Sequence, residues 1–332
     1  MSNESPTKQP LKTWSHLQAK KKRPSEYDIV ARRGVYNVRQ PDCALELDPN
    51  VPMNEWFRRY RRDASLQHSD WDSFTDPDKL TYRMYVAAQD HQESYVDGLL
   101  GEYCRIDHDQ HLDPVWLATL QRFYTPGRYI LHAQQMWAGY VAMMAPASTI
   151  VNCLGFQAGD SLRWLSRTAY RTAELRRSWP DAEFGQAERS VWEDDPAWQG
   201  FREVVERILT TFDWGESLVA MNVVIKPAID QCYLRQLEQV ARRNNDELLA
   251  LLNDAQWLDS ERSQRWMRAF IRFCAEESDD NSQAIAAHIQ KWVPPVDAAI
   301  DAYCKALCSD QNVAAQAKQS AATFRREFGA EI

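Results

Sequence analysis

The sequence contains few of the residues that form tight turns. Only 11 of its 332 residues are glycine and 15 are proline. β-Sandwiches and β-barrels need turn signals about every 8–12 residues, so this scarcity argues against both architectures. Hydrophobic residues make up 44% of the chain, which is enough for a large packed interior. The composition therefore favours a helical protein built around one core.

The sequence also lacks the residue spacing of a well-known metal site. Helical bundles that hold a carboxylate-bridged di-iron centre use Glu-x-x-His on each of two helices and one Glu on each of two others. None of the seven histidines here has Asp or Glu three residues before or after it, and no acidic residue lies between Asp113 and Asp160. A bundle built from this sequence is therefore expected to hold no metal and no catalytic residue of its own.

Several other sites and segments have no signature either. The chain has no Gly-rich phosphate loop, nucleophile elbow or dinucleotide fingerprint, and its seven cysteines include no CxxC pair. A net charge of −8 argues against a nucleic-acid partner. The longest uncharged run, residues 129–159, is interrupted by Pro146 and by four amide side chains, so it predicts no membrane span. Without a signal peptide, these features indicate a cytoplasmic protein with reduced thiols.

Helical periodicity begins near residue 76. The expected helices start at Asp76-Pro77, run from Asp113-Pro114 to a break at Pro126-Gly127, and cover about 148–179, 199–211, 214–243 and 246–277. Pro227 is expected to kink the helix that contains it, and Pro294-Pro295 to divide a final pair at about 282–308. The pattern predicts an all-α layered bundle at residues 76–280, with C-terminal helices at 281–332 completing the same domain.

Residues 1–75 form a predicted N-terminal arm without sustained periodicity. Basic patches at 20–23 and 58–62 alternate there with single aromatic residues. Disordered segments are usually poor in aromatics, so we expect an ordered arm that lies on partner subunits. Trp, Tyr and Arg are enriched at interface hot spots, although a basic patch can equally be a solvated face. The predicted partner-binding residues are Trp14, Tyr27, Trp56, Arg58, Arg59, Arg61 and Arg62.

Two helices carry similar polar turns, Gly-Asp-Ser-Leu-Arg-Trp at 159–164 and Leu-Asp-Ser-Glu-Arg-Ser at 258–263. On local grounds each Asp can pair with the Arg three residues later. The chain here resembles the ferritin-like hydroxylases of bacterial multicomponent monooxygenases, whose catalytic alpha subunits have Asp-Glu-x-Arg-His at these turns, with Glu and His binding iron. Carried over, the ligand positions fall on Ser161, Trp164, Ser260 and Ser263, with Asp230 near a lone-carboxylate position. None of those four binds iron as a carboxylate or imidazole does.

The resemblance is closer to the non-catalytic beta subunits of these hydroxylases. The matching stretches occur in the same order along nearly the whole chain. They lie at 12–17 (KTWSHL), 23–30 (RPSEYDIV), 76–83 (DPD followed by YR), 92–96 (QESYV), 144–150 (MAPASTI), 161–165 (SLRWL), 168–172 (TAYRT) and 213–216 (DWGE).

This resemblance implies a dimer of alpha-beta-gamma heterotrimers with di-iron in the alpha subunit and no cofactor in this chain. It also implies an effector protein, a ferredoxin and an NADH-dependent reductase that serve the complex. The reaction would be hydroxylation or epoxidation of an aromatic or alkene hydrocarbon with O2. The substrate itself is not predicted, because its pocket would lie in another polypeptide.

Two other interpretations stay open. The chain could be a stand-alone metalloenzyme with unconventional ligands such as Asp230, Glu216 and His132, or a helical scaffold or regulatory protein unrelated to oxygenases. On local grounds His132 is expected to be a hydrogen-bonded core histidine with Gln134 or Gln135 as its partner. Residues 107–111 (DHDQH) are expected to form a solvated connector.

Overall fold

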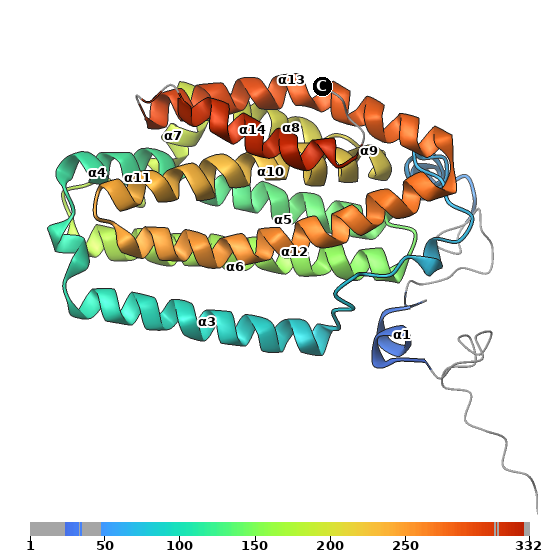
Figure 1. The fold of residues 1–332 in the computed structure, drawn as a ribbon, viewed down its shortest axis with the longest axis horizontal. Coiled ribbons are helices and arrows are strands. Elements are labelled where there is room, and N and C mark those ends of the chain that lie inside the picture. The colour runs from blue at the N-terminus through green and yellow to red at the C-terminus, as the bar shows by residue number, and fades with distance from the viewer. Residues whose placement is uncertain (1–23, 33, 35–47, 309, 311, 329–332) are drawn as a thin grey trace, which may run out of the picture.

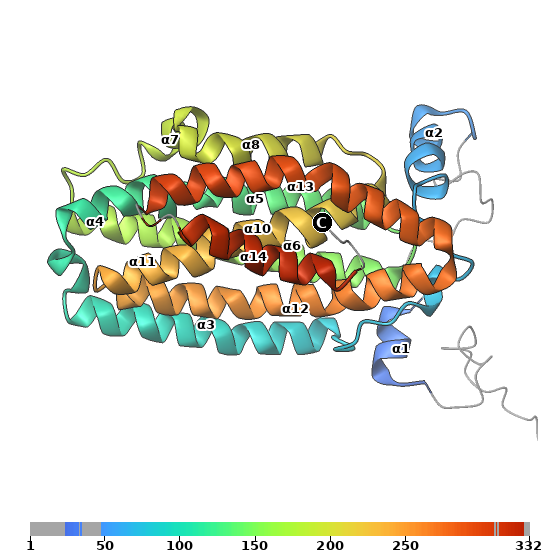
Figure 2. The same ribbon diagram turned by 45° about the horizontal axis from the view of Figure 1, so that its top comes forward.

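The computed structural model describes residues 24–32, 34, 48–308, 310 and 312–328, and every regular element within them is helical. The predicted all-α class is confirmed. Figures 1 and 2 show the long helices running roughly along one axis, and in Figure 1 α3 lies at one edge with α13 and α14 at the opposite edge. These long helices are α3 (Tyr82–Arg105), α5 (Gly127–Met144), α6 (Ser148–Ser178), α8 (Pro196–Leu209), α12 (Glu247–Glu277), α13 (Asp279–Leu307) and α14 (Asn312–Arg326). None of the helices in the described ranges is long and apolar enough to cross a membrane.

Shorter elements connect the long helices. They are α1 (Glu26–Ala31), α2 (Pro52–Phe57), η2 (Arg58–Arg62), η3 (Trp71–Ser73), η4 (His108–His111), α4 (Pro114–Thr119), η5 (Leu120–Tyr124) and α7 (Glu188–Asp194). Helix α4 begins at the predicted Asp113-Pro114 signal. The long helix α8 begins in the same way, with Asp195 as its cap and proline as its first residue. A proline is well tolerated there, since its missing N–H would have no partner inside the helix.

The centre of the molecule is one rod of α- and π-helix at residues 214–243. It comprises α9 (Trp214–Val219), η6 (Ala220–Ile225), α10 (Lys226–Ile229), η7 (Asp230–Gln236) and α11 (Leu237–Arg243). The rod is buried almost all round, as expected for a helix that is apolar on every face. Pro227 lies at the start of α10, directly after a π-helical turn. The wider turn accommodates the missing N–H, so the rod continues past the proline.

Two predicted helix boundaries are wrong. Asp76-Pro77 does not start a helix, because the Asp76 carboxylate accepts hydrogen bonds from the Asp78 and Leu80 N–H groups and closes a turn. Helix α3 begins six residues after Asp76, at Tyr82, and is capped by Thr81. Pro294 and Pro295 do not divide a pair either, because both lie inside the continuous helix α13. Buried residues on both sides, including Trp292 and Val296, pack both halves against the same core.

The described part of the predicted arm packs on its own bundle. Leu66 and Phe74 belong to the main core, and the N–H and hydroxyl groups of Ser65 both bond the Asp213 carboxylate. Gly215 allows this close approach, since a Cβ there would lie 2.8 Å from Leu66 Cγ. The segment that contains Ser65, Leu66 and Phe74 thus packs on this chain itself. Partner binding by the arm stays a prediction, mainly for the residues before Ser65.

Candidate functional site

The four degenerate ligand positions lie together at the centre of the bundle. Ser161 and Trp164 are on α6, and Ser260 and Ser263 are on α12. All four line one small cavity of about 20 Å³, together with Lys226 of the central rod. This volume holds about one water molecule.

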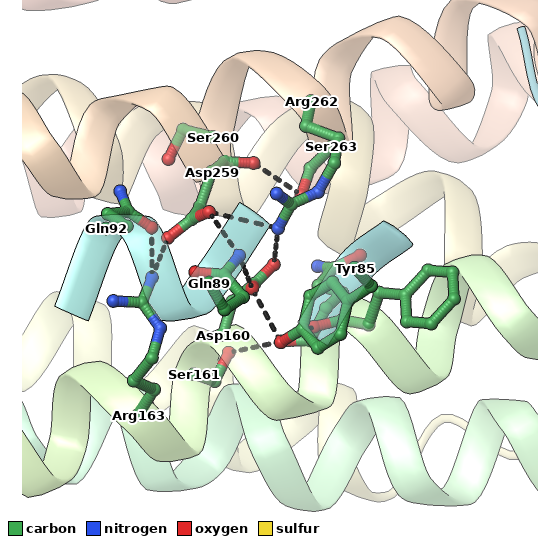
Figure 3. A network of polar contacts seen from close by, with 12 residues as sticks. Tyr85, Gln89, Gln92, Asp160, Ser161, Arg163, Asp259, Ser260, Arg262 and Ser263 are labelled. Atoms are coloured by element: carbon green, nitrogen blue, oxygen red, sulfur yellow. Dashed lines mark hydrogen bonds and ion pairs between the residues drawn. The ribbon is translucent and has the colours of Figure 1, made fainter. Parts of the chain in front are cut away.

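Two acidic and two basic side chains beside this cavity pair across the helices (Figure 3). Arg262 of α12 pairs with Asp160 of α6, and Arg163 of α6 pairs with Asp259 of α12. The local pairing expected from the sequence occurs only for Arg262 and Asp259, at 3.0 Å. The two polar turns therefore tie α6 to α12.

Helix α3 closes the network with amide and phenol groups. Gln89 Nε2 donates to one carboxylate oxygen of Asp160 at 3.2 Å and to one of Asp259 at 3.1 Å. The Tyr85 hydroxyl donates to Asp160 at 2.9 Å (Figure 3). On the same helix Glu93 accepts from Arg163 at 2.7 Å. Three helices thus share one network of ion pairs and hydrogen bonds.

The side chains at the degenerate positions are engaged in other bonds. The Trp164 indole donates to Asp259 Oδ2 at 2.8 Å, and an indole N–H has no acceptor function. The Ser161 and Ser263 hydroxyls donate to carbonyl groups of their own helices, at 3.0 and 3.1 Å. Ser260 accepts from Lys226 Nζ at 2.9 Å. All four polar groups are therefore engaged within the protein.

Both burial and neighbouring charges shift the pKa values of the ionisable side chains at this site. Burial and the neighbouring Asp259 carboxylate raise the pKa of Asp160 to about 7, against the opposing effect of Arg262. Burial alone would lower the pKa of Arg262, but Asp160 and Asp259 raise it above its ordinary value. Burial and the Asp160 charge also raise the pKa of the Tyr85 hydroxyl, which keeps it a hydrogen-bond donor.

The side chains present here do not fit a di-iron centre. Such a centre needs several carboxylates and two imidazoles, whereas the cavity lining contains no histidine or glutamate and only two carboxylates, those of Asp160 and Asp259. The nearby carboxylates of Asp160 and Asp259 are bonded to guanidinium groups, and Asp230 is bonded to Lys226. Within the described ranges, no group of three or more His, Cys, Asp or Glu residues is arranged to hold a metal ion.

The unconventional ligands considered above do not come together. Asp230 Oδ2 accepts from Lys226 Nζ at 2.6 Å. Glu216 accepts from Lys291 Nζ at 2.6 Å and from the Trp292 indole at 3.0 Å. His132 lies on the exposed side of α5, so the expectation that it is a core histidine is wrong. The nearby Gln134 is buried instead.

Residues 107–111 are more ordered than a solvated connector. Asp109 forms an ion pair with Arg171, whose side chain is buried. His108 Nε2 lies 3.1 Å from Asp246, and that carboxylate also accepts from the Trp116 indole at 2.9 Å. Burial opposes ionisation of Asp246, but His108 and Arg171 keep its pKa below the ordinary value.

The predicted partner-binding residues are spread over two surroundings. Tyr27 is buried and its hydroxyl accepts from the Asp76 N–H at 3.2 Å, and the Trp56 indole donates to Tyr140 at 3.3 Å. Both therefore contact this chain itself. Trp14 lies outside the described residues.

The four arginines occupy η2. Arg58 donates to the Pro49 carbonyl at 2.9 Å, while its buried Nε has no partner within the described residues. The Arg59 and Arg61 guanidinium groups lie 5.1 and 5.8 Å from the ring centroids of Tyr60 and Phe57. Arg62 is exposed. Arg58 and Arg59 line an open depression of about 550 Å³ that also contains acidic side chains.

Sequence reasoning missed four residues that complete the site: Tyr85, Gln89, Glu93 and Lys226. The first three lie on α3, which has no counterpart in the ligand motif. Glu93 falls in a stretch that matched the beta subunits, but it was assigned no role. Lys226 did have a signal, because it and Asp230 are the only charged residues between Ser217 and Leu234 and they are four residues apart.

Known proteins with similar sequences belong to the hydroxylases of multicomponent monooxygenases. Residues 53–278 match the family model of the methane/phenol/alkene hydroxylases. The beta subunit of the hydroxylase component of the toluene-4-monooxygenase system of Ectopseudomonas mendocina is 49% identical over 310 residues, 93% of this chain and 94% of that protein. The oxygenase component DmpL of phenol 2-monooxygenase from Pseudomonas sp. (strain CF600) is 25% identical, over 70% of this chain and 69% of that protein.

Solved structures give the same result. A chain in the structure of toluene 4-monooxygenase with toluene in its resting active site aligns with a TM-score of 0.87 and 48% identity, covering 91% of this chain and 99% of that chain. A chain of phenol hydroxylase from Pseudomonas sp. OX1 shares the fold, with a TM-score of 0.82 at 19% identity over 99% and 98% of the two chains. The predicted ferritin-like fold is confirmed. This chain belongs to the methane/phenol/alkene hydroxylase family, as a beta-type subunit of the hydroxylase component of a multicomponent monooxygenase.

Proposed function

We propose that this chain is the non-catalytic scaffold of a hydroxylase made of alpha, beta and gamma subunits, arranged as a dimer of heterotrimers. The di-iron centre belongs to the alpha subunit in this proposal. The observation that supports it best is the centre of this bundle, where ion pairs among Asp160, Arg163, Asp259 and Arg262 occupy the surroundings of the degenerate ligand positions. Those bonds hold the helices rigidly together without metal, and a rigid neighbour supports the geometry of an active site.

The similarity to the toluene-4-monooxygenase beta subunit extends the proposal to the reaction. The assembled enzyme hydroxylates an aromatic hydrocarbon, or epoxidises an alkene, with O2 in the cytoplasm. An effector protein, a ferredoxin and an NADH-dependent reductase serve it. This chain contributes assembly and support for the alpha subunit.

We also propose a surface for contact with the alpha subunit. Helices α5 and α6 are joined within a stretch, residues 129–159, that contains no Asp, Glu, Lys or Arg. Met136 and Met143 of α5 and Leu162 of α6 are nevertheless about half exposed. A Cβ added to Gly139 of α5 or to Gly155 of α6 would meet nothing within 4 Å, so another helix can approach closely at these positions. Exposed large apolar side chains on neighbouring helices are typical of an interaction site.

The basic residues of η2 form a second proposed contact. Arg58, Arg59, Arg61 and Arg62 lie on one π-helical turn beside the aromatic rings of Phe57 and Tyr60. Arginine and aromatic side chains anchor many protein interfaces. The partner surface is expected to carry carboxylates, since burial lowers the pKa of Arg61 and an acidic partner would compensate its charge.

Metal analysis of the full-length chain tests the scaffold proposal. The chain is incubated with excess Fe(II) under anaerobic conditions, desalted and assayed for iron, with the assembled hydroxylase treated in parallel. We expect iron in the assembled hydroxylase and a sub-stoichiometric trace, on the order of 0.1 per chain or less, in the isolated chain. One or two irons per isolated chain would contradict the proposal.

A further inference from the structure

We infer that the ammonium group of Lys226 is a built-in cation of this bundle, which neutralises Asp230 and ties the central rod to α12 where related bundles use metal. This inference goes beyond the proposed function and does not depend on how the complex assembles. It arises from the mismatch between the side chains of this site and a di-iron centre.

The contacts of Lys226 are those of a coordinated cation. Its Nζ donates to Asp230 Oδ2 at 2.6 Å and to Ser260 Oγ at 2.9 Å. The Lys226 side chain is 11% exposed and the Asp230 side chain 6%. Lysine is almost never buried this far unless it is paired, because the charged group loses its hydration. One ammonium group therefore joins two oxygens from two different helical segments.

The place of Lys226 in the fold is equally specific. It lines the cavity of about 20 Å³ that the four degenerate positions also line. One of those positions, Ser260, is its hydrogen-bond partner. Asp230, which lies near the lone-carboxylate position, is its ion-pair partner. The ammonium group thus contacts one of the positions at which the resemblance puts metal ligands and a carboxylate close to another.

Charge balance supports the same assignment. Three carboxylates, of Asp160, Asp230 and Asp259, are buried around the site. Arg163 and Arg262 compensate two of them. Lys226 compensates the third, so these three carboxylates and three cations balance one another when all six groups are ionised. Without its ammonium group, the Asp230 carboxylate would be a buried and unpaired anion, which is the situation that metal binding relieves in a metal-containing bundle.

Chemical rescue in the full-length chain tests the inference. Lys226→Ala removes the ammonium group and leaves space beside Asp230 and Ser260. We expect the melting temperature to fall by roughly 5–10 °C. Ethylammonium chloride on the order of 100 mM should restore at least half of the loss, because a ligand that binds only the folded state stabilises it. Sodium chloride at equal ionic strength, and ethanol as a neutral molecule of similar size, should restore little.

Lys318→Ala is the matched control, because Lys318 pairs with Asp301 on the surface at partly exposed positions. It should lower the melting temperature by less than about 2 °C and show no ethylammonium effect. Equal rescue by sodium and ethylammonium would overturn the inference, and so would an unchanged melting temperature in Lys226→Ala. Either result leaves the iron-binding test of the scaffold proposal unaffected.

A second variant covers the case in which Lys226→Ala does not fold. In Lys226→Met/Asp230→Asn both charges are removed and the side-chain volumes are nearly kept. We expect this double variant to fold and to melt within a few degrees of the wild type, on the order of 5 °C or less, as replaced buried ion pairs often do. If it fails to fold while Asp230→Asn folds, the role of Lys226 is not charge compensation.

Discussion

Asp259→Asn is the most informative single perturbation of the central network. The Asp259 carboxylate accepts from the Trp164 indole at 2.8 Å and from Gln89 at 3.1 Å, and it pairs with Arg163 and Arg262. Asparagine has nearly the same shape but no charge. One of its terminal atoms becomes an N–H₂ group, which must face a donor, since every partner of Asp259 donates.

The expected loss follows from what each arginine retains. Breaking a buried ion pair by removing one partner costs about 3–5 kcal/mol. Here Arg163 keeps Glu93 at 2.7 Å and Arg262 keeps Asp160, so neither cation is left unpaired. The loss of the Asp259 charge also removes one of the causes that raise the pKa of Asp160. We therefore expect the low end of the range, about 3 kcal/mol.

Urea unfolding of the full-length chain measures this loss. The midpoint should fall while the slope of the transition stays constant, since the surface exposed on unfolding is the same. Asp301→Asn is the control, because it neutralises one partner of an exposed pair with Lys318 and should cost about 0.5 kcal/mol or less. A loss below about 1 kcal/mol for Asp259→Asn would refute the view that this network holds α3, α6 and α12 together.

Three further predictions concern surfaces and pH. Met136→Glu should abolish or weaken co-purification with the alpha subunit, whereas Met84→Glu, at an equally exposed position of α3, should not. Equal yields for both variants would show that Met136 of α5 is not part of the interface. Replacing Arg58, Arg59, Arg61 and Arg62 by Ala should weaken assembly in a salt-dependent way while leaving the circular dichroism spectrum unchanged; wild-type affinity at low and high salt would make these residues a solvated face. The folded-state pKa of Asp160, about 7, lies above its ordinary 3.8, so the stability that Asp160 contributes is present below about pH 4 and falls by up to about 4 kcal/mol as the pH rises to about 7. Urea unfolding at pH 4.5 and 7.5 should show that wild type loses stability relative to Asp160→Asn at the higher pH. A stability difference that does not change with pH would contradict this prediction.

Most of the bundle was predictable because its helix ends carry local signals. Helices α6 and α12 begin and end within about one residue of the prediction, bounded by Pro146, Pro180 and the Asp246 cap. The prediction was wrong where tertiary contacts overrule such signals. Pro294 and Pro295 lie inside α13 because buried residues on both sides pack on one core. A proline shows in the sequence, but the surface that holds the helix straight does not.

The composition of the site was predictable only at the positions defined by a motif. Ser161, Trp164, Ser260 and Ser263 do lie at one cavity. Their cross-pairing neighbours could not be deduced, because Asp160 and Arg262 are 102 residues apart. A single sequence shows which residues are four apart on one helix, but not which helices are neighbours. The role of Gln89 could not be predicted for the same reason, since its partners Asp160 and Asp259 lie on other helices.

The balanced charges at the centre of this bundle restrict how the chain can change over evolutionary time. A gain of metal binding would need carboxylates or imidazoles at Ser161, Trp164, Ser260 and Ser263, and a neutral residue at Lys226. Each of these steps alone has a cost. A new carboxylate would be an uncompensated buried charge, a larger side chain at a serine would crowd a cavity of about 20 Å³, loss of the Trp164 indole would remove a donor to Asp259, and loss of Lys226 would leave Asp230 unpaired. Each intermediate protein would be less stable than its parent. Metal binding is thus separated from this chain by a barrier of several unfavourable substitutions.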